Sequence, residues 1–272
     1  MLLAGFDAGQ TSTRCRVCRW QDDGWQIIGE GSGPGVSHLE AAGGAERFRQ
    51  AVLTSLKSAS EGEGERKLDA AVIGASGIEQ GSALQPKATA LLADALSLPE
   101  DRVLATGDER TALRGAFPDG DGIILISGTG MICLGRDRQG KEHRCGGWGW
   151  MLDGAGSAFD LGHQGLQLTL QMADGRRPDH LLRQRMWEQL GCRGHADVKA
   201  WVVQPSRTAA DLAALAPLLV AAADAGLPAA QDILQRSASA LVSCAATVAR
   251  ELALPQPAVA GLGGVLQHQG SV

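Results

Sequence analysis

Two short segments rich in glycine and hydroxyl side chains have the composition of phosphate-binding turns. Asp7-Ala-Gly-Gln-Thr-Ser-Thr13 follows an apolar run at residues 2–6, and Ser127-Gly-Thr-Gly130 follows another at residues 123–126. A tight turn between strands directs several backbone N–H groups to one place and forms an anion site. Each turn taken alone could be an ordinary hairpin with hydroxyls at the surface. Two of them in corresponding halves of the chain favour a polyphosphate held from both sides, although neither is a Walker sequence.

Two aspartates lie where a carboxylate could take part in phosphoryl transfer. Asp7 ends the first apolar run, and its oxygens could hold Mg²⁺ through water. Asp108 lies in Thr106-Gly-Asp-Glu-Arg110, after a short apolar segment and before a predicted helix. It could accept a proton from a hydroxyl that attacks a phosphate. Aspartate is also among the best helix N-cap residues, and spacing alone favours the cap for Asp108.

Two further glycine-rich segments could contact the organic parts of the substrates. The glycines of Ala260-Gly-Leu-Gly-Gly-Val265 would let a flat ring lie against the backbone, as adenine requires, or they mark a helix entry without a ligand. Gly146-Gly-Trp-Gly-Trp150 places tryptophans beside backbone donors, which suits a sugar face or a structural hairpin. His143 and His163 flank this loop without a second ligand at metal spacing, so we expect neither to be catalytic.

Regular elements must hold these segments. Hydrophobic patterning predicts strands at 2–6, 14–19, 25–30, 68–73 and 103–105, helices at 40–59, 86–96 and 109–117, and a charged loop at 61–67. It then predicts strands at 122–126, 131–135 and 258–262, and helices from Gly156, at 209–225 and at 229–252. A strand, a glycine/hydroxyl turn, a returning strand and then helices therefore begin near residue 2 and again near residue 122. This repetition predicts an α/β protein with two similar domains, 1–115 and 116–272, and a cleft between them.

Composition excludes several classes of protein. The 272 residues carry a net charge of −5 and no basic run, which argues against nucleic acid as a partner. No apolar stretch reaches the roughly 18 residues that span a membrane, and the N-terminus does not resemble a signal peptide. Of the six cysteines only Cys15 and Cys18 have ligand-like spacing, and residues three apart on a strand face opposite sides. We therefore expect free, reduced thiols and a cytoplasmic protein.

Taken together, these motifs resemble one family in order and spacing along nearly the whole chain. The sequence is similar to the BadF/BadG/BcrA/BcrD-type members of the actin-like ATPase superfamily, and within them to N-acetylglucosamine and glucosamine kinases. The two phosphate turns, the Thr106-Gly-Asp108 segment, the tryptophan loop and the final glycine segment all resemble motifs of these kinases. The resemblance implies two ribonuclease H-like (actin-like ATPase) domains, a small-molecule sugar substrate, and ATP with Mg²⁺ as cofactors.

The resemblance also implies roles for individual residues. Asp108 would be the general base that activates the sugar 6-hydroxyl, which now outweighs the cap, and Asp7 would organise Mg²⁺. The residues expected to contact ATP are Gly9, Thr11, Ser12, Thr13, Gly128, Thr129, Gly130, Gly263 and Gly264. Those expected to contact the sugar are Ser37, His38, Gly147, Trp148 and Asp153.

The chain departs from these kinases in the sugar loop. Gly154 and Ala155 replace the usual acidic pair, Asp153 lies one place earlier, and the chain contains no asparagine to contact the sugar near Ser37. Two alternatives to a sugar kinase therefore stay open. One is an ATPase of the BadF/BadG type, although the cysteine-containing segment that holds an iron–sulfur cluster in such proteins is missing. The other is a degenerate sugar- or nucleotide-binding member, and a homodimer is open for any of them.

Overall fold

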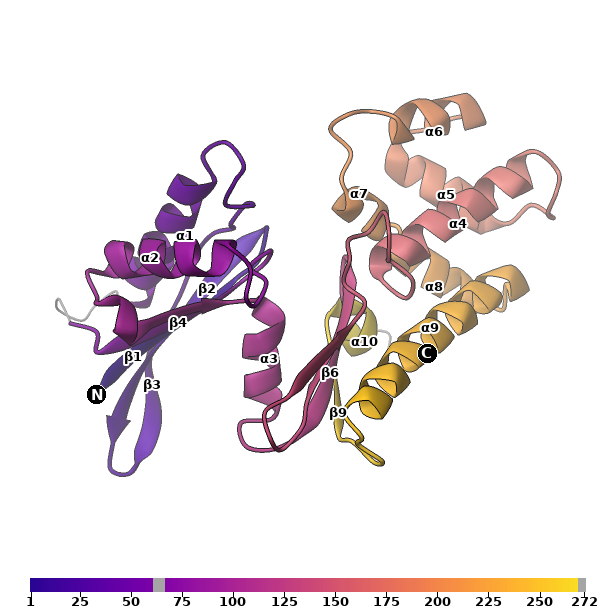
Figure 1. Ribbon diagram of the computed structural model, residues 1–272. Coiled ribbons are helices and arrows are strands. Elements are labelled where there is room, and N and C mark those ends of the chain that lie inside the picture. Colours follow the sequence, from indigo (N-terminus) through magenta and orange to yellow (C-terminus); the bar gives the residue numbers. More distant parts are fainter. Residues whose placement is uncertain (61–66, 269–272) are drawn as a thin grey trace. The chain divides into compact units, whose positions relative to one another are not determined.

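The structure is a computed structural model that describes residues 1–60 and 67–268. These residues form two compact units, Met1–Gly115 and Ala116–Val272, each built on its own β-sheet (Figure 1).

The sheet of the first unit has five strands in the order β3-β2-β1-β4-β5. Strand β1 pairs antiparallel with β2, which pairs antiparallel with β3, and β1 and β4 are parallel, as are β4 and β5. The strands are β1 (Leu2–Ala8), β2 (Ser12–Gln21), β3 (Gly24–Pro34), β4 (Ala70–Ala75) and β5 (Val103–Thr106). Because β1, β4 and β5 run parallel to one another, their carboxyl ends lie at the same edge of the sheet.

Two helices, α1 (Gly44–Ala59) and α2 (Leu84–Leu96), supply most of the core that covers one face of this sheet. Phe48, Val52 and Leu92 from the helices are fully buried with Phe6 and Ile73 from the strands. A short 3-10 helix, η1 (Glu100–Arg102), leads into β5, and α3 (Asp108–Ala116) follows it. Burial of these side chains against the strands fixes which face of β1 is turned away from the core.

The sheet of the second unit repeats the first without its last strand. Its order is β8-β7-β6-β9, with β6 antiparallel to β7 and parallel to β9. The strands are β6 (Gly122–Ser127), β7 (Met131–Arg136), β8 (Glu142–Cys145) and β9 (Val259–Leu262). The turn between β6 and β7 therefore corresponds to the turn between β1 and β2.

Helices of the second unit form two hydrophobic cores. Ile123 and Cys133 of the sheet pack with Leu241 and Val248 of α9, and a separate core joins the other helices. The helices are α4 (Ala158–Ala173), α5 (Leu181–Leu190), α6 (His195–Val202), α7 (Ala209–Ala213), α8 (Ala216–Asp224), α9 (Pro228–Glu251) and α10 (Gly264–His268). Within the described residues no single helix has the length and hydropathy to cross a membrane, and the helices at 209–224 and 228–251 pass that test only as a pair bent by 118°.

The predicted strands are present, but several boundaries were wrong. The first predicted turn is shorter, because Ser12 and Thr13 already belong to β2. The helix predicted from residue 40 begins at Gly44, since Gly43 has a left-handed backbone with φ of 73°. The single helix predicted at 209–225 is two helices, α7 and α8, because Pro217 lacks an N–H and its ring crowds the carbonyl four residues earlier. Most of the predicted loop at 61–67 lies outside the described residues.

Candidate active site

The turn between β1 and β2 presents backbone donors at the edge of the first sheet. Its two ends are tied together, because Gly9 N donates to Ser12 O at 3.0 Å and Val36 N donates to Gly9 O at 2.9 Å. Among the described residues, the N–H groups of Gln10 and Thr11 have no acceptor. Thr11 and Ser12 are exposed beside them. The turn therefore offers two unpaired amides and two hydroxyls to a ligand.

Thr13 is placed differently from its neighbours in the motif. It pairs with Ala8 across the strands, on the core face, and is fully buried. Its Oγ1 has no hydrogen-bond partner among the residues described. Asp7 pairs with Arg14 on the opposite face, because side chains alternate along a strand. The structure thus brings Thr11 and Ser12 to the edge but turns Thr13 into the core.

Gly74 allows the helix that carries Asp108 to lie directly on the sheet next to Asp7. In the parallel strands Gly74 is the register partner of Asp7 on one side and of Thr106 on the other. A Cβ on Gly74 would lie 2.2 Å from Oγ1 of Thr111, which is in the first turn of α3. That same Oγ1 donates to the backbone oxygen of Asp108 at 2.8 Å. Because Gly74 has no side chain, the first turn of α3 can pack directly on the strands, and this packing sets the position of Asp108.

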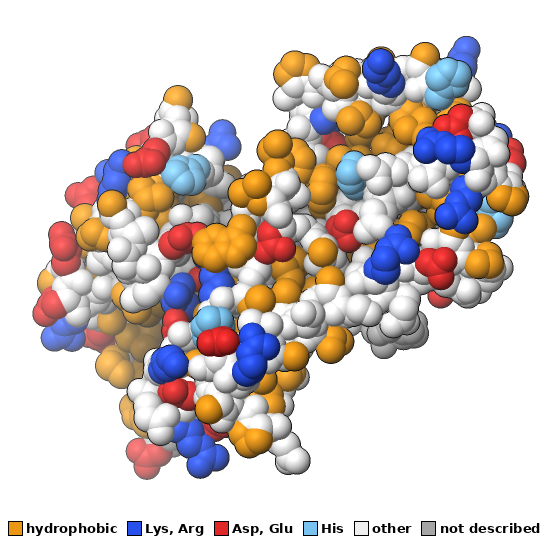
Figure 2. All heavy atoms as spheres, turned by 45° about the vertical axis from the view of Figure 1, so that its right-hand side comes forward, with side chains coloured by type: hydrophobic (Ala, Val, Ile, Leu, Met, Phe, Trp, Pro, Cys, Tyr) orange, Lys and Arg blue, Asp and Glu red, His pale blue; other side chains and the backbone are white. Residues whose placement is uncertain are grey.

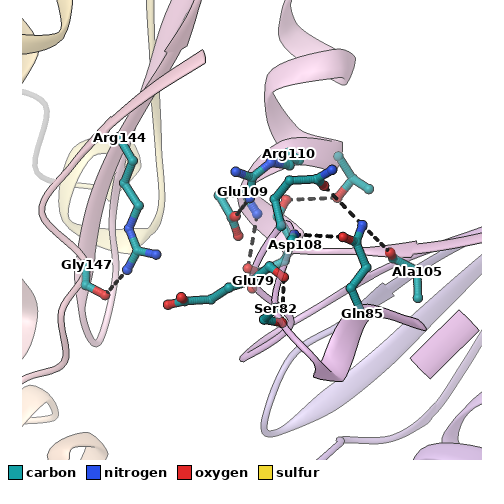
Figure 3. Close-up of polar contacts among 12 residues, drawn as sticks. Glu79, Ser82, Gln85, Ala105, Asp108, Glu109, Arg110, Arg144 and Gly147 are labelled. Atoms are coloured by element: carbon teal, nitrogen blue, oxygen red, sulfur yellow. Dashed lines mark hydrogen bonds and ion pairs between the residues drawn. The ribbon is translucent and has the colours of Figure 1, made fainter. Parts of the chain in front are cut away.

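Asp108 is the first residue of α3 and is not its cap. The carbonyl of Gly107 accepts from the amides of Arg110 at 3.1 Å and Thr111 at 3.4 Å, so Gly107 occupies the cap position. Oδ1 of Asp108 accepts from the adjacent Glu109 N at 3.0 Å. The Asp108 carboxylate also lies within hydrogen-bonding reach of the Glu109 side chain, and this contact contributes to the raised pKa of Glu109. Figure 3 shows Asp108, Glu109 and Arg110 together at the start of α3.

Negative charge is concentrated at this point. Partial burial raises the pKa of Asp7, the Asp108 carboxylate raises it further, and Arg14 opposes both. Burial, and to a lesser extent Asp108, raises the pKa of Glu109, although Arg110 Nη1 pairs with Glu109 Oε1 at 2.6 Å. Asp7, Arg14, Asp108 and Thr111 line one groove of about 860 Å³. A cation bound here would relieve repulsion that Arg14 and Arg110 offset only in part.

The turn between β6 and β7 offers the same kind of site in the second unit. Gly128 N donates to Gly130 O at 2.9 Å, which closes the turn. The amides of Thr129 and Gly130 are exposed and have no acceptor among the residues described. The carbonyl groups of this turn do have partners within the protein. Ala158 N donates to Gly128 O, and Phe159 N donates to Thr129 O. The first turn of α4 thus holds this loop from behind and leaves its donors open.

Two segments distant in sequence complete the surroundings of this turn. Ser127 Oγ donates to Gly156 O at 2.6 Å, which ties the end of the tryptophan loop to the end of β6. Gly263 has φ of 89°, and a Cβ there would lie 2.3 Å from Ser127 O. The structure therefore brings the predicted phosphate turn and the predicted nucleoside segment, Gly263 and Gly264, to one place within the second unit.

The tryptophan loop at 146–157 is exposed at residues 148–152 and is held by Arg144 of β8 and by a backbone hydrogen bond of its own. Gly146, Gly147 and Gly149 have φ between 78° and 93°, which glycine tolerates best. The guanidinium of Arg144 lies 4.3 Å from the ring of Trp148, which is 59 % exposed, and Arg144 also donates to Gly147 O (Figure 3). Asp153 N donates to Gly149 O at 2.8 Å, and its carboxylate lies against Gly146.

The remaining sugar candidates, Ser37 and His38, lie in the first unit beside its phosphate turn. A Cβ on Gly35 would lie 2.2 Å from Gln10 O, so this segment passes directly under the turn. His38 is exposed, and its ring lies near Gly77 after β4. Cys15 and Cys18 are free thiols, Cys15 is buried, and no group of three ligand residues occurs in the described part of the chain.

Sequence reasoning missed two supports of the site. Gly74 and Thr111 carry no local signal, because their contact joins segments far apart in the chain. Asp160 did have one: it stands three residues after Ser157, in the Ser-x-x-acid pattern of a helix start. Its N–H donates to Ser157 Oγ at 3.2 Å, and its Oδ2 accepts from Gly156 N at 3.1 Å.

Paired units of this topology, each with a donor turn between its first two strands, define the actin-like ATPase fold. A protein of Chromobacterium violaceum provisionally named as an N-acetylglucosamine kinase has this fold, with a TM-score of 0.78 and 28 % identity over 98 % of this chain and 88 % of that one. A glucokinase of Streptomyces griseus shares the fold alone, with a TM-score of 0.51 and 16 % identity over 98 % of this chain and 95 % of that one. The predicted fold class is confirmed.

The chain belongs to the BadF/BadG/BcrA/BcrD ATPase family, whose sequence profile matches residues 4–272. It is 28 % identical over 169 residues to an N-acetylmuramic acid/N-acetylglucosamine kinase of Clostridium acetobutylicum, covering 61 % of this chain and 55 % of that protein. It is 31 % identical over 153 residues to an N-acetyl-D-glucosamine kinase of Dictyostelium discoideum, covering 55 % and 48 %. The matches span about half the length of these curated relatives. The family resemblance is confirmed, and membership of an ATPase family implies the use of ATP.

Proposed function

We propose that this protein transfers the γ-phosphate of ATP to the 6-hydroxyl of an amino sugar of the N-acetylglucosamine class. The observation that carries the proposal is the start of α3, where Asp108 lines the same groove as Asp7 and lies close enough to raise the pKa of that residue. The similarity to amino-sugar kinases supports the choice of acceptor.

In the proposed reaction Asp108 takes the proton of the sugar hydroxyl. As that proton moves to the carboxylate, the hydroxyl oxygen bonds to the γ-phosphorus, and the bond from phosphorus to the bridging oxygen of ADP breaks. The unpaired amides of Gln10 and Thr11 in one unit, and of Thr129 and Gly130 in the other, are donors suited to phosphate oxygens. Catalysis of this kind depends mainly on positioning and charge neutralisation.

The residues present fit a magnesium ion held through water. Mg²⁺ usually keeps several waters and uses one or two carboxylates, so the lack of a three-ligand cluster among the described residues does not conflict with it. Asp7 would hold the ion, which would neutralise phosphate charge. Burial first and Asp108 second raise the pKa of Asp7, so a cation beside it would favour its ionised form.

ADP release measured with and without sugar tests this function. We expect release that depends on N-acetylglucosamine, glucosamine or N-acetylmuramic acid, with glucose as the comparison sugar, and an Asp108→Asn variant at least about 100-fold lower in kcat. ATP binding by that variant should be unchanged. Release without any sugar would instead favour an ATPase.

One observation favours a second candidate, a member that binds its ligands without catalysis. Gly154 and Ala155 carry no polar side chain at the place where similar kinases have an acidic pair. Binding of ATP and sugar, measured by calorimetry, with no turnover on any of the four sugars would support this alternative over the kinase.

A further inference from the structure

A second groove lies between α4 and α6, on residues that the proposed reaction does not use. Its volume is about 540 Å³, within the range of small-molecule sites. Figure 2 shows it as a hollow beneath the uppermost helix, with hydrophobic walls and with basic and histidine side chains at its margin. Its lining includes Leu170, Ala173, His195, Val198, Lys199 and Val202.

The groove is lined by apolar side chains of both helices, including Leu170 of α4 and Val198 and Val202 of α6. Val198 is buried and forms the floor of the apolar surface, whereas other valines are open to water. Val202 is 42 % exposed, and its neighbour Val203, which also lines the groove, is 70 % exposed. Apolar surface of this kind is covered favourably by an apolar ligand, because water leaves both surfaces.

The charged groups at the margin are unbalanced towards positive. The acidic residue that lines the groove, Asp174, is already matched by Arg176, whose Nε and Nη2 donate to it at 2.6–3.0 Å. These bonds hold the pKa of Asp174 below its usual value. Lys199 stands one helical turn from His195 and has no ion-pair partner among the described residues. The margin therefore has an unpaired ammonium group next to an apolar wall.

We propose that this groove binds a small amphipathic anion. Its apolar body would lie between α4 and α6, and its carboxylate, sulfonate or phosphate would face Lys199 and His195. Charge complementarity carries the choice of an anion over a neutral or cationic ligand. The site is separate in residues from the glycine turns and the tryptophan loop, so it stands independently of the kinase function.

Two dyes of the same scaffold test the proposal on the full chain. The probes are 1-anilinonaphthalene-8-sulfonate, which is anionic, and N-phenyl-1-naphthylamine, which lacks the sulfonate. Fluorescence titration should show that one equivalent of the anion binds, more tightly than the neutral dye. Lys199→Gln should weaken the anion about fivefold and leave the neutral dye unchanged, whereas Lys87→Gln on α2 should change neither. Lys87 is a matched control because it is exposed and outside the groove.

A second variant locates the binding. Ala173 is exposed at the end of α4 and lines the groove, so Ala173→Trp should fill it and abolish binding of both dyes. Ala221→Trp, at an exposed alanine of α8 away from the groove, should leave both intact. Circular dichroism and thermal melting establish that each variant is folded. The proposal is overturned if wild type binds neither dye, if Ala173→Trp binds both as wild type does, or if Lys199→Gln affects the two dyes equally.

Discussion

A methyl group on Gly74 should misplace Asp108 without touching it. In the structure a Cβ at this position lies 2.2 Å from Thr111 Oγ1, 2.8 Å from its Cγ2 and 3.0 Å from its Cβ. Ordinary contact needs about 3.4 Å or more, so the first turn of α3 must move by roughly 1 Å. A misplacement of that size can cost about 100-fold in turnover. Gly74→Ala should therefore lower kcat by about that factor, and overpacking should lower the free energy of unfolding by about 1–3 kcal/mol.

Two further variants separate this mechanism from general damage to the sheet. Gly5→Ala places a methyl on β1, on the same face as Asp7 and lining the same groove, where no atom lies within 4 Å of it. It should keep wild-type kcat. Thr111→Gly in the Gly74→Ala background removes all three clashing atoms and should restore part of kcat, measured by ADP release with sugar at saturation.

Two results would contradict the proposal that Gly74 sets the position of Asp108. A folded Gly74→Ala protein with wild-type kcat would mean that the height of α3 does not set the activity. Equal losses in Gly5→Ala and Gly74→Ala would mean that the open sheet face itself, rather than the contact with Thr111, is what matters.

Three further predictions concern other parts of the site. Gly263→Ala puts a Cβ 2.3 Å from Ser127 O at φ of 89°, so the KM for ATP should rise about tenfold or more; Gly261→Ala, with only ordinary contacts, should leave it unchanged. Thr13→Val removes a buried hydroxyl that has no partner, so the free energy of unfolding in urea should stay equal or rise by up to about 1 kcal/mol; a loss of ATP affinity would instead assign that hydroxyl to the ligand. Burial raises the pKa of Glu109, so its ionised form destabilises the fold at pH 7, and acidification towards 4.5 relieves this. Glu109→Gln should therefore stabilise the protein more at pH 7 than at pH 4.5, and a pH-independent difference would contradict the assignment.

Local patterns in the sequence predicted the strands and the places of the two glycine/hydroxyl turns well; that these turns bind phosphate stays a prediction. Residues 2–6 and 123–126 are short apolar runs, each followed within a few residues by a segment of glycine and hydroxyl residues, and runs of this length and setting favour buried strands. Period-two alternation could also have placed Thr13 in the core, since Cys15 and Val17 alternate with exposed arginines after it. The misreading came from treating all hydroxyls of the motif as part of one turn.

Contacts between distant segments could not be predicted in this way. The glycine at residue 74 matters only because Thr111 packs on it, and nothing near either residue signals the pair. Strand β8 and helices α5 and α6 were not predicted, because they are short or mix polar and apolar residues without a clear period. The groove between α4 and α6 needs α6, so it could not be predicted from the sequence.

The close packing of β3 on α1 restricts the motion of the chain beneath the turn between β1 and β2. Gly29, Gly31 and Gly33 face α1, and a Cβ on Gly29 would lie 2.0 Å from Ala59 O. The backbone of Gly29 therefore lies in direct contact with this helix-terminal carbonyl and leaves no room for a side chain. The backbone of β3 thus packs directly on the backbone of α1, and the chain continues from β3 to Gly35 beneath the turn between β1 and β2. We expect slow hydrogen exchange at the β3 amides that pair with β2 and fast exchange at Gln10 and Thr11, so that the ligand donors move on an anchored base.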